Sequence, residues 1–177
     1  APLRRYITAL RASVGGVSPT VVHSNGFKTD LLAAWAVGGR LPLVWHLHDY
    51  VSARRVTSHL LRVAAGRADL AIANSSSVAA DARRVFGSRL AVQVVLNGVD
   101  VDSLAAEGGK LDLDGASGLA PAPDGTVRVG LIATYARWKG QLAFLDAVSR
   151  LPDGLGVRAY VVGGPVYRTA GSQFSDA

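Results

Sequence analysis

The sequence predicts an α/β protein in which helices are layered on doubly wound parallel β-sheets, in two successive lobes. Three observations lead to this prediction. Short apolar runs rich in valine, leucine and isoleucine alternate with amphipathic helical segments, as is typical of such sheets. A stretch rich in glycine, proline, alanine and aspartate at residues 107–125 interrupts this rhythm, which then restarts. Most predicted strands also end in a polar or glycine-rich cluster.

The composition is that of a folded, basic protein. Apolar residues make up 49% of the 177 residues, charged residues make up 18%, and the formal net charge is +6. These values exclude a disordered chain and favour an anionic partner such as a nucleotide. Cysteine is absent, which excludes disulfides and thiolate metal sites. No arginine-rich block with interleaved aromatic residues occurs, so we expect no nucleic-acid partner.

The sequence contains no signal for a membrane span. No apolar run reaches the roughly 18 residues that cross a bilayer, and no signal peptide opens the chain. We therefore expect a cytoplasmic location, with a possible peripheral membrane contact.

The first lobe begins with an amphipathic helix at residues 2–12, because Leu3, Ile7 and Leu10 recur at helical spacing. Glycines at 15–16 are expected to end it. Four strands follow, and the nearly continuous apolar character of the second is expected inside a parallel sheet. The strands are predicted at residues 20–24, 41–47, 69–73 and 91–96. Helices are predicted between them at residues 29–37, 51–66 and 77–86, the last one capped by the Asn-Ser-Ser-Ser run at 74–77.

The apolar residues of these helices fall on single faces. We expect Leu31, Leu32 and Trp35 to point inward, and Val56, Leu60 and Val63 to share one face of the next helix. Of the three tryptophans, Trp35 and Trp45 are expected in the core, and Trp138 is the one possible exception.

The second lobe restarts the same rhythm after the 107–125 stretch, which we interpret as a surface loop or linker. A strand at 126–133, a helix at 140–151 and a strand at 157–162 are predicted. Leu142, Leu145, Val148 and Leu151 are expected on the inner face of that helix. Two strands and one helix cannot bury a doubly wound core, so we expect both lobes to be incomplete.

Six segments of the sequence together carry a resemblance. They are VVHSNG, LVWHLHDY, DLAIANSSSVAADARRVFG, VVLNGVD, GLIATYARWKGQLAFLDAVSRL and VVGGPVYRTAGSQF. In this order and at these intervals they resemble the family 4 retaining glycosyltransferases of the GT-B fold, over essentially the whole chain. Members of that family have two Rossmann-like lobes, an N-terminal one for the acceptor and a C-terminal one for the nucleotide-sugar, and react in the cleft between them. The resemblance implies that residues 1–120 are a partial acceptor-side lobe and that residues 121–177 begin the nucleotide-sugar lobe.

The implied activity is hexosyl transfer from a nucleoside-diphosphate sugar to a sugar, lipid or small-molecule acceptor, with retention of configuration. No cofactor and no metal ion are expected, because a helix dipole and basic residues neutralise the leaving diphosphate. The chain alone is expected to be inactive, since the paired-glutamate motif of the family is missing. Two alternatives stay open: a GT-B sugar-nucleotide 2-epimerase, which would need further carboxylates, and a non-catalytic nucleotide-sugar-binding module.

By the resemblance, His48 lies beside the donor sugar, where an imidazole or its backbone stabilises an oxocarbenium-like transition state. The alternative is that His48 merely caps its strand. His23 and Asn25 follow the preceding strand and are expected to face the cleft and touch the acceptor. We expect His46 on the opposite side of its strand from His48, in a structural role.

Lys139 matches the phosphate-binding lysine of the family, in the Lys-Gly pair with Gly140 that opens the first helix of the second lobe. A lysine at a helix start is otherwise mildly unfavourable, which supports the functional interpretation. The family usually has a glycine-arginine pair five residues earlier, and this chain has an alanine and Thr134 there. We expect Arg137 to supply the missing phosphate contact.

Each of the remaining candidates has both a functional and a structural interpretation. Gly163 and Gly164 match a loop where the backbone approaches the substrate, or they form a simple turn. Asn97 matches the loop that leads toward the lobe crossover, or it caps a short helix.

Overall fold

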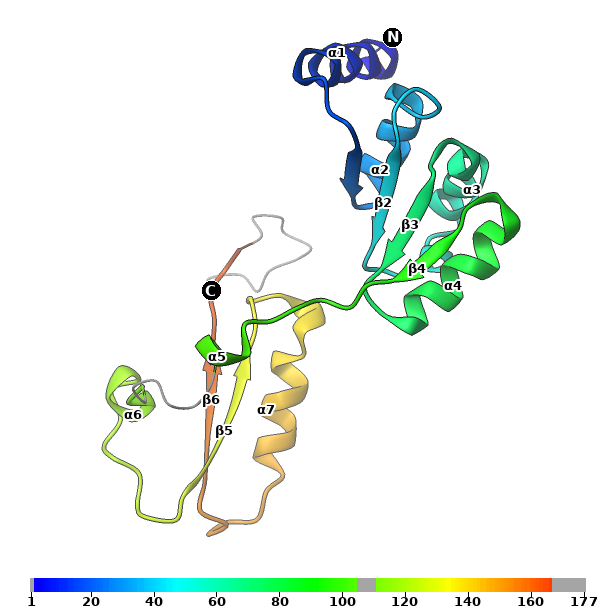
Figure 1. Cartoon of the computed structure of the whole chain (residues 1–177). Helices are drawn as coiled ribbons and strands as arrows, with labels where there is room; N and C mark the ends of the chain where they lie inside the picture. Colours follow the sequence, from blue (N-terminus) through cyan, green and yellow to red (C-terminus); the bar gives the residue numbers. More distant parts are fainter. Residues whose placement is uncertain (1, 105–110, 167–177) are drawn as a thin grey trace. The chain divides into compact units, whose positions relative to one another are not determined.

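The computed structural model describes residues 2–104 and 111–166. The described residues fall into two compact units that divide between Asp100 and Val101. The boundary predicted near residue 120 lies within the second unit. Figure 1 shows the elements of each unit.

The first unit is built on a four-stranded parallel sheet. Its strands are β1 (Val22–Asn25), β2 (Leu43–Leu47), β3 (Leu70–Ala73) and β4 (Val92–Val94). They lie in the order β1-β2-β3-β4, and all neighbouring pairs are parallel. The register brings the ends of adjacent strands level, with Asn25 opposite His46. The predicted α/β fold with parallel sheets is confirmed.

Helices connect the strands of this sheet. The helices are α1 (Pro2–Val17), α2 (Phe27–Ala36), α3 (Arg55–Ala64) and α4 (Ser76–Phe86), with short 3-10 turns η1 (Val51–Ala53), η2 (Ala65–Arg67) and η3 (Gly87–Arg89). Ser75 caps α4, because its Oγ accepts a hydrogen bond from the Val78 amide at 3.2 Å. Helix α2 packs on β1 and β2, and α4 packs on β3 and β4 (Figure 1).

The core lies between the sheet and these helices. Leu43, Trp45 and Leu47 alternate along β2 and are fully buried, whereas the residues between them are half-buried on the opposite face. The Trp45 ring meets Phe86 of α4 edge-on, with ring centroids 5.8 Å apart. The predicted core position of Trp45 is confirmed.

Helix α1 is longer than expected. It continues through Gly15 and Gly16 and ends at Val17, and the next residue, Ser18, has a φ of +50°. Each glycine costs a helix roughly 0.5–1 kcal/mol, so packing must offset this cost. Residues on one side of α1 pack against the core, and Arg11 donates a hydrogen bond from Nε to the Ala36 carbonyl at 2.8 Å.

Helix α2 is oriented differently from the prediction. Trp35 is 45% exposed, so its predicted core position is wrong, and Leu31 and Leu32 are only half-buried. Small side chains occupy the buried side of α2 instead, which allows a close approach to the sheet: Ala33, Ala34 and Ala36. The apolar face of α3 with Val56, Leu60 and Val63 is likewise exposed, while Leu61 and Ala64 are buried.

The second unit contains a two-stranded parallel sheet and three helices among its described residues. The strands are β5 (Val127–Ile132) and β6 (Val157–Val162), and the helices are α5 (Val101–Leu104), α6 (Leu113–Ala116) and α7 (Gln141–Ser149), with a 3-10 turn η4 (Arg137–Lys139). Leu142 is 67% exposed and Leu145 is 51% exposed, so the predicted inner face of this helix is wrong. The two strands β5 and β6 offer too little apolar surface to cover this face of α7.

The prediction that residues 107–125 form a surface loop or linker is partly wrong. Residues 111–125 contain α6, whose Asp114 is buried against the sheet. Arg158 donates to Asp114 Oδ1 at 2.6 Å, Arg128 donates to Oδ2 at 2.8 Å, and the Tyr160 hydroxyl also donates to Oδ1. These bonds fasten α6 to β5 and β6. Residues 107–110 lie outside the described part of the chain.

None of the helices within residues 2–104 and 111–166 is both long and apolar enough to cross a bilayer.

Candidate functional site

A polar cavity lies at the carboxyl ends of β1 and β2 in the first unit. Its volume is about 280 Å³. The lining residues come from the end of β1, the first turn of α2, the end of β2 and the start of α3: Asn25, Gly26, Phe27, Lys28, Thr29, His48, Asp49, Arg54 and Thr57. The structure therefore brings two predicted site residues, Asn25 and His48, into one cavity. Ligands of open α/β sheets bind at this edge of the sheet.

The turn between β1 and α2 shapes this cavity. Gly26 has φ +102°, a conformation that favours glycine. Thr29 Oγ1 donates to the backbone carbonyls of Asn25 and Gly26, at 2.7 Å each. These contacts fix the backbone beside the Asn25 side chain, which lines the cavity. Arg54 lies across the Phe27 ring, with its guanidinium carbon 5.9 Å from the ring centroid.

Three histidines lie in a row beside the cavity. The rings of His23 and His46 stack with centroids 5.3 Å apart, and His46 meets His48 edge-on at 6.5 Å. Partial burial, followed by the nearby His23 and His48, lowers the pKa of His46. The expectation that His46 points away from His48 is wrong, because the two rings contact each other edge-on.

Helix α4 holds the loop that follows His48 in place through Asp81. Asp81 is buried and accepts hydrogen bonds from the Ser52 amide at 3.0 Å and from Ser52 Oγ at 2.6 Å. Burial alone would raise the pKa of Asp81, but the Ser52 hydrogen bonds and the charge of Arg84 hold it below its usual value. Sequence reasoning missed Asp81, because nothing local marks an aspartate in a helix as the anchor of a distant loop.

A second buried carboxyl lies in α2. Asp30 is fully buried, and Ser24 Oγ donates to its Oδ1 at 2.6 Å, while its Oδ2 has no hydrogen-bond partner among the described residues. Burial raises the pKa of Asp30 to about 7, although the Ser24 hydrogen bond opposes this shift. The sequence carried no signal for this pair, which forms only when α2 packs on β1.

The predicted phosphate-binding residues gather at the end of β5 in the second unit. Arg137 and Lys139 lie in η4 and are exposed, and within residues 111–166 neither side chain forms a hydrogen bond or an ion pair. Gly140 follows with φ +82° and precedes α7, which begins at Gln141 and not at the Lys-Gly pair. Gln141 Nε2 donates to the Thr134 carbonyl at 2.8 Å, and the buried Thr134 hydroxyl has no described partner.

The glycines after β6 reach the same end of that sheet. A Cβ on Gly163 would lie 1.9 Å from the Ala133 carbonyl oxygen, so this position requires glycine. The Tyr135 amide donates to the Gly164 carbonyl at 3.0 Å, which joins the two strand ends. A Cβ on Gly164 would meet nothing within 4 Å. The close backbone approach at Gly163 is thus to the protein itself.

The last candidate, Asn97, is exposed in the stretch between β4 and α5. Within residues 2–104 and 111–166, no group of three His, Asp or Glu side chains gathers in a way that would hold a metal ion. The roles assigned to the candidate residues stay predictions, including those of His23, His48 and Lys139.

Two crystal structures of Anabaena Alr3699/HepE resemble the chain. The complex with UDP-glucose is 26% identical with a TM-score of 0.71, and the match covers 92% of this chain and 44% of that one. The complex with UDP and glucose is 25% identical with a TM-score of 0.60, and the match covers 94% and 44%. The chain thus spans less than half the length of these structures. No curated protein sequence matches it.

The match to a family model shows which family the chain belongs to. The model described as Glycosyltransferase Family 4 matches residues 1–103, which is more than half of the chain. This match covers the first unit with its strand-end cavity, and the structural match to the GT-B glycosyltransferase extends over both parallel sheets. The chain belongs to Glycosyltransferase Family 4.

Proposed function

We propose that this protein transfers a sugar from a nucleoside-diphosphate sugar to an acceptor, with retention of the anomeric configuration. The observation that carries the proposal is the start of α7. There, two exposed cations without a described ion partner, Arg137 and Lys139, precede a helix without a side-chain cap, at the carboxyl end of a parallel strand. Such a helix start attracts diphosphates. The similarity to a protein crystallised with UDP-glucose supports a nucleotide-sugar donor.

In this proposal the donor diphosphate binds Lys139 and Arg137, with the backbone at Gly140 and Thr134 beside them. Both cations stabilise the negative charge that develops on the leaving diphosphate. This route needs no bound metal ion, because the side chains supply the compensating charge. Gly163 supports the same strand end by its close contact with the Ala133 backbone.

The proposed roles in the first unit concern the sugar and the acceptor. His48 would contact the donor sugar as positive charge develops at its anomeric carbon, and Asn25 would contact the acceptor in the cavity that both residues line. His23 would act through His46, on which its ring stacks. We propose a hexose as the sugar and a sugar, lipid or small molecule as the acceptor, acting in the cytoplasm.

The activity test uses the complete protein with a panel of UDP- and GDP-sugars and candidate acceptors. Release of nucleoside diphosphate together with a glycosylated product supports transfer, and the anomeric coupling constant of the product tests retention. Epimerised sugar without any acceptor would favour the 2-epimerase alternative. Donor binding without turnover for any acceptor would favour a non-catalytic module.

The phosphate site has its own test. Lys139→Ala is expected to weaken UDP binding by about tenfold or more, because a hydrogen bond to a charged group contributes roughly 1.5–3 kcal/mol. Arg137→Ala should weaken it similarly. Arg150→Ala is the control, because Arg150 follows the opposite end of α7 and pairs with Asp146 at 2.9 Å on the surface. Isothermal titration of UDP gives the affinities, and unchanged binding in the Lys139 variant would refute the assignment.

A further inference from the structure

The polar cavity at the carboxyl ends of β1 and β2 carries an excess of positive charge. Its lining includes the two cations Lys28 and Arg54 but a single acidic residue, Asp49. All three side chains are exposed, and none of them forms an ion pair with another residue of the described chain. The cavity that His48 lines therefore presents two cations without protein counterions to a ligand.

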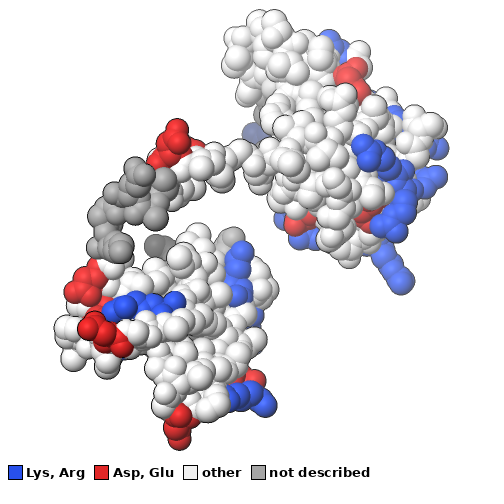
Figure 2. Space-filling view, turned by 60° about the horizontal axis from the view of Figure 1, so that its bottom comes forward, with Lys and Arg blue, Asp and Glu red and all other residues white. Residues whose placement is uncertain are grey.

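The charge of the surrounding unit has the same sign. Residues 1–100 contain twelve Lys and Arg but only five Asp and no Glu, and two of these aspartates, Asp30 and Asp81, are buried. Figure 2 shows blue side chains predominating on the first unit in that view. A positive field of this kind raises the local concentration of anions around the cavity.

Both cations of the cavity occupy positions that are unfavourable for a cation. Arg54 is the N-cap residue of α3, and Lys28 is the second residue of α2. Neither helix start has a side-chain cap, and α3 has no acidic residue in its first turn. A positive charge beside the positive end of a helix dipole is mildly destabilising, so a bound anion would compensate both cations. Side chains that break a local rule in this way are expected at functional sites.

The Arg54 side chain extends from a segment that is held in place. The Ser58 amide donates to the Arg54 carbonyl at 2.8 Å. Two residues before Arg54, Ser52 is anchored by its two hydrogen bonds to Asp81. The Arg54 guanidinium itself lies over the Phe27 ring. A planar guanidinium on a fixed backbone can donate two parallel hydrogen bonds to one phosphate.

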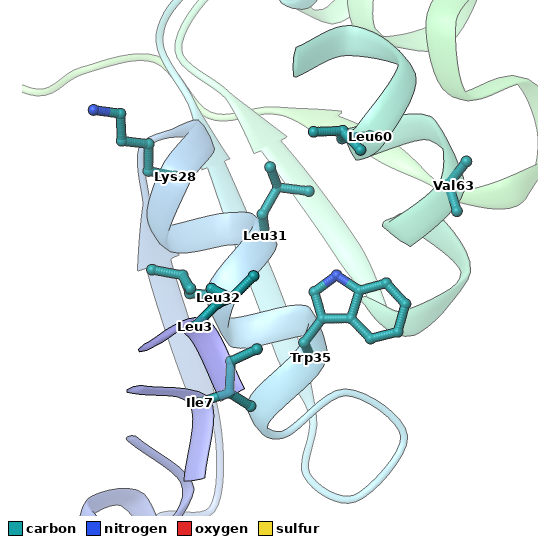
Figure 3. A pocket seen from close by; sticks show the side chains of 8 residues that line it. All are labelled: Leu3, Ile7, Lys28, Leu31, Leu32, Trp35, Leu60 and Val63. Atoms are coloured by element: carbon teal, nitrogen blue, oxygen red, sulfur yellow. The ribbon is translucent and has the colours of Figure 1, made fainter. Parts of the chain in front are cut away.

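Lys28 lines both the polar cavity and a neighbouring apolar groove of about 390 Å³. Figure 3 shows its ammonium group directed away from the aliphatic and indole side chains of that groove. The half-buried Thr57 also lines the polar cavity, and its hydroxyl has no hydrogen-bond partner among the described residues. Lys28 and Thr57 are therefore available as donors to a ligand in the polar cavity.

We infer that the acceptor carries a phosphate group and that Lys28 and Arg54 bind this phosphate in the polar cavity. The inference rests on the transfer reaction proposed above. A phosphate monoester carries close to two negative charges near neutral pH, whereas a carboxylate carries one, so two cations match a phosphate. The cavity volume of about 280 Å³ is below that of pockets for drug-sized ligands, so the cavity suits a small phosphorylated sugar or headgroup.

A neutral sugar or the donor diphosphate fits these residues less well. A neutral acceptor would use the Asn25 amide and the Thr57 hydroxyl but would leave both cations without a partner. The donor diphosphate has its own pair of exposed cations in the second unit, Arg137 and Lys139. A soluble sugar phosphate and a lipid headgroup would offer the same phosphate, so the binding test has an arm for each source.

The binding test titrates the complete protein with matched pairs of neutral and phosphorylated probes. One pair is glucose and glucose 6-phosphate, the other is dihexanoylglycerol and dihexanoyl phosphatidic acid, and glucuronic acid is the carboxylate probe. At least one phosphorylated probe is expected to bind at least about tenfold more tightly than its neutral partner, because hydrogen bonds between charged groups are strong. The pair that shows this difference identifies the source of the phosphate. Equal affinity within both pairs, no binding of either phosphorylated probe, or tighter binding of glucuronic acid would overturn the inference.

Charge-neutralising variants locate the phosphate site. Lys28→Gln and Arg54→Gln are each expected to weaken binding of the phosphorylated probe by about tenfold or more, and to leave the affinity for UDP within about twofold of the wild type. Arg55→Gln is the matched control, because Arg55 is the adjacent exposed arginine and does not line the cavity. Equal losses at Arg54 and Arg55 would show a general charge effect and contradict the inference. A tenfold loss of UDP affinity would assign the two cations to the donor and overturn it as well.

Steady-state kinetics separates failure of this inference from failure of the transfer reaction. With a phosphorylated acceptor, Lys28→Gln and Arg54→Gln should raise the acceptor KM and change kcat little, because the phosphate is bound equally in the ground state and the transition state. Transfer to neutral acceptors with a KM that neither variant changes would refute the phosphate site and leave the transfer reaction standing. Tight binding of a phosphorylated probe that both variants weaken, without transfer to any acceptor, would refute the reaction and leave the phosphate-binding cavity standing.

Discussion

At the scale of single residues, two of the buried carboxyl groups of the described residues, those of Asp30 and Asp114, behave in opposite ways. Asp30 keeps its proton to unusually high pH, because burial raises its pKa to about 7. Asp114 behaves in the opposite way, because Tyr160, Arg128 and Arg158 hold its pKa well below the ordinary value. The difference follows from the partners: one hydroxyl for Asp30, two guanidinium groups and a phenol for Asp114.

Asp30 makes stability depend on pH near neutrality. Its pKa is higher in the folded chain than the ordinary 3.8, so its favourable contribution is complete below about pH 4 and is lost as the pH rises through about 7. Asp30→Asn should therefore flatten the dependence of the melting temperature on pH between 4 and 8. Thermal melts at several pH values test this.

Ser24→Ala provides the companion variant for Asp30. It removes the hydrogen bond that opposes the shift, so the loss of stability should extend to still higher pH. A wild-type stability that does not fall between pH 5 and pH 8 would contradict the buried, protonated state of Asp30.

Gly163 is required by packing alone. Gly163→Ala should lower the free energy of unfolding by about 1–3 kcal/mol, because the new Cβ would overlap the Ala133 carbonyl and force the two strand ends apart. Gly164→Ala is the matched control, since its Cβ would meet nothing within 4 Å. Similar stability of the two variants in urea unfolding would show that the strand ends can separate at little cost.

At the scale of secondary structure elements, Asp114 decides how α6 is attached. Asp114→Asn should detach the segment around α6 from β5 and β6, because the charge that pairs with Arg128 and Arg158 is lost. The segment should then exchange its amide hydrogens faster. Asp112→Asn is the control, because asparagine caps a helix about as well as the aspartate that caps α6.

The attachment of α6 should also depend on acid. The low pKa of Asp114 means that its contribution is complete above the ordinary value of 3.8 and is lost as the pH falls below it. Hydrogen exchange of residues 111–122 at falling pH would detect the loss. Exchange that stays equally slow when Asp114 is protonated would show that α6 is held by other contacts.

The sequence predicted the elements better than it predicted their faces. Apolar periodicity located the strands and helices of the first unit, and Ser75 capped α4 as expected. Periodicity identifies which residues share a face but not which face is covered. Val56, Leu60 and Val63 do share a face of α3, yet the core is on the side of Leu61 and Ala64.

At the scale of the whole molecule, family membership and fold were predictable and the candidate site was predictable only in part. The order of short motifs is preserved along the chain, so the family could be inferred before any coordinates. Asn25 and His48 meet in one cavity because parallel strands end at the same edge of a sheet. The anchoring roles of Asp81 and Asp114 depend on contacts between residues far apart in the sequence, which no local pattern encodes.

The exposed leucines of the second unit have a related cause. Leu142 and Leu145 follow a helical apolar period, which indicates that a surface is available to be covered. The chain spans 44% of the related solved structures, and its described second unit has two strands. Periodicity reports the surface that a helix can bury, whereas the structure reports the surface that this chain does bury.

The alanine-lined inner side of α2 has a consequence for how the chain tolerates change. In a library of all single substitutions in this helix, the positions with large residues should tolerate replacement better than the positions with small residues. The bulky outward positions Leu32 and Trp35 should accept many replacements for folding, while Ala34, which is wholly enclosed, should accept almost nothing larger than serine. Gly38 should be equally restricted, because any side chain there would collide with the Ala34 and Arg67 carbonyl oxygens. In α2, therefore, the smallest residues should be the least replaceable.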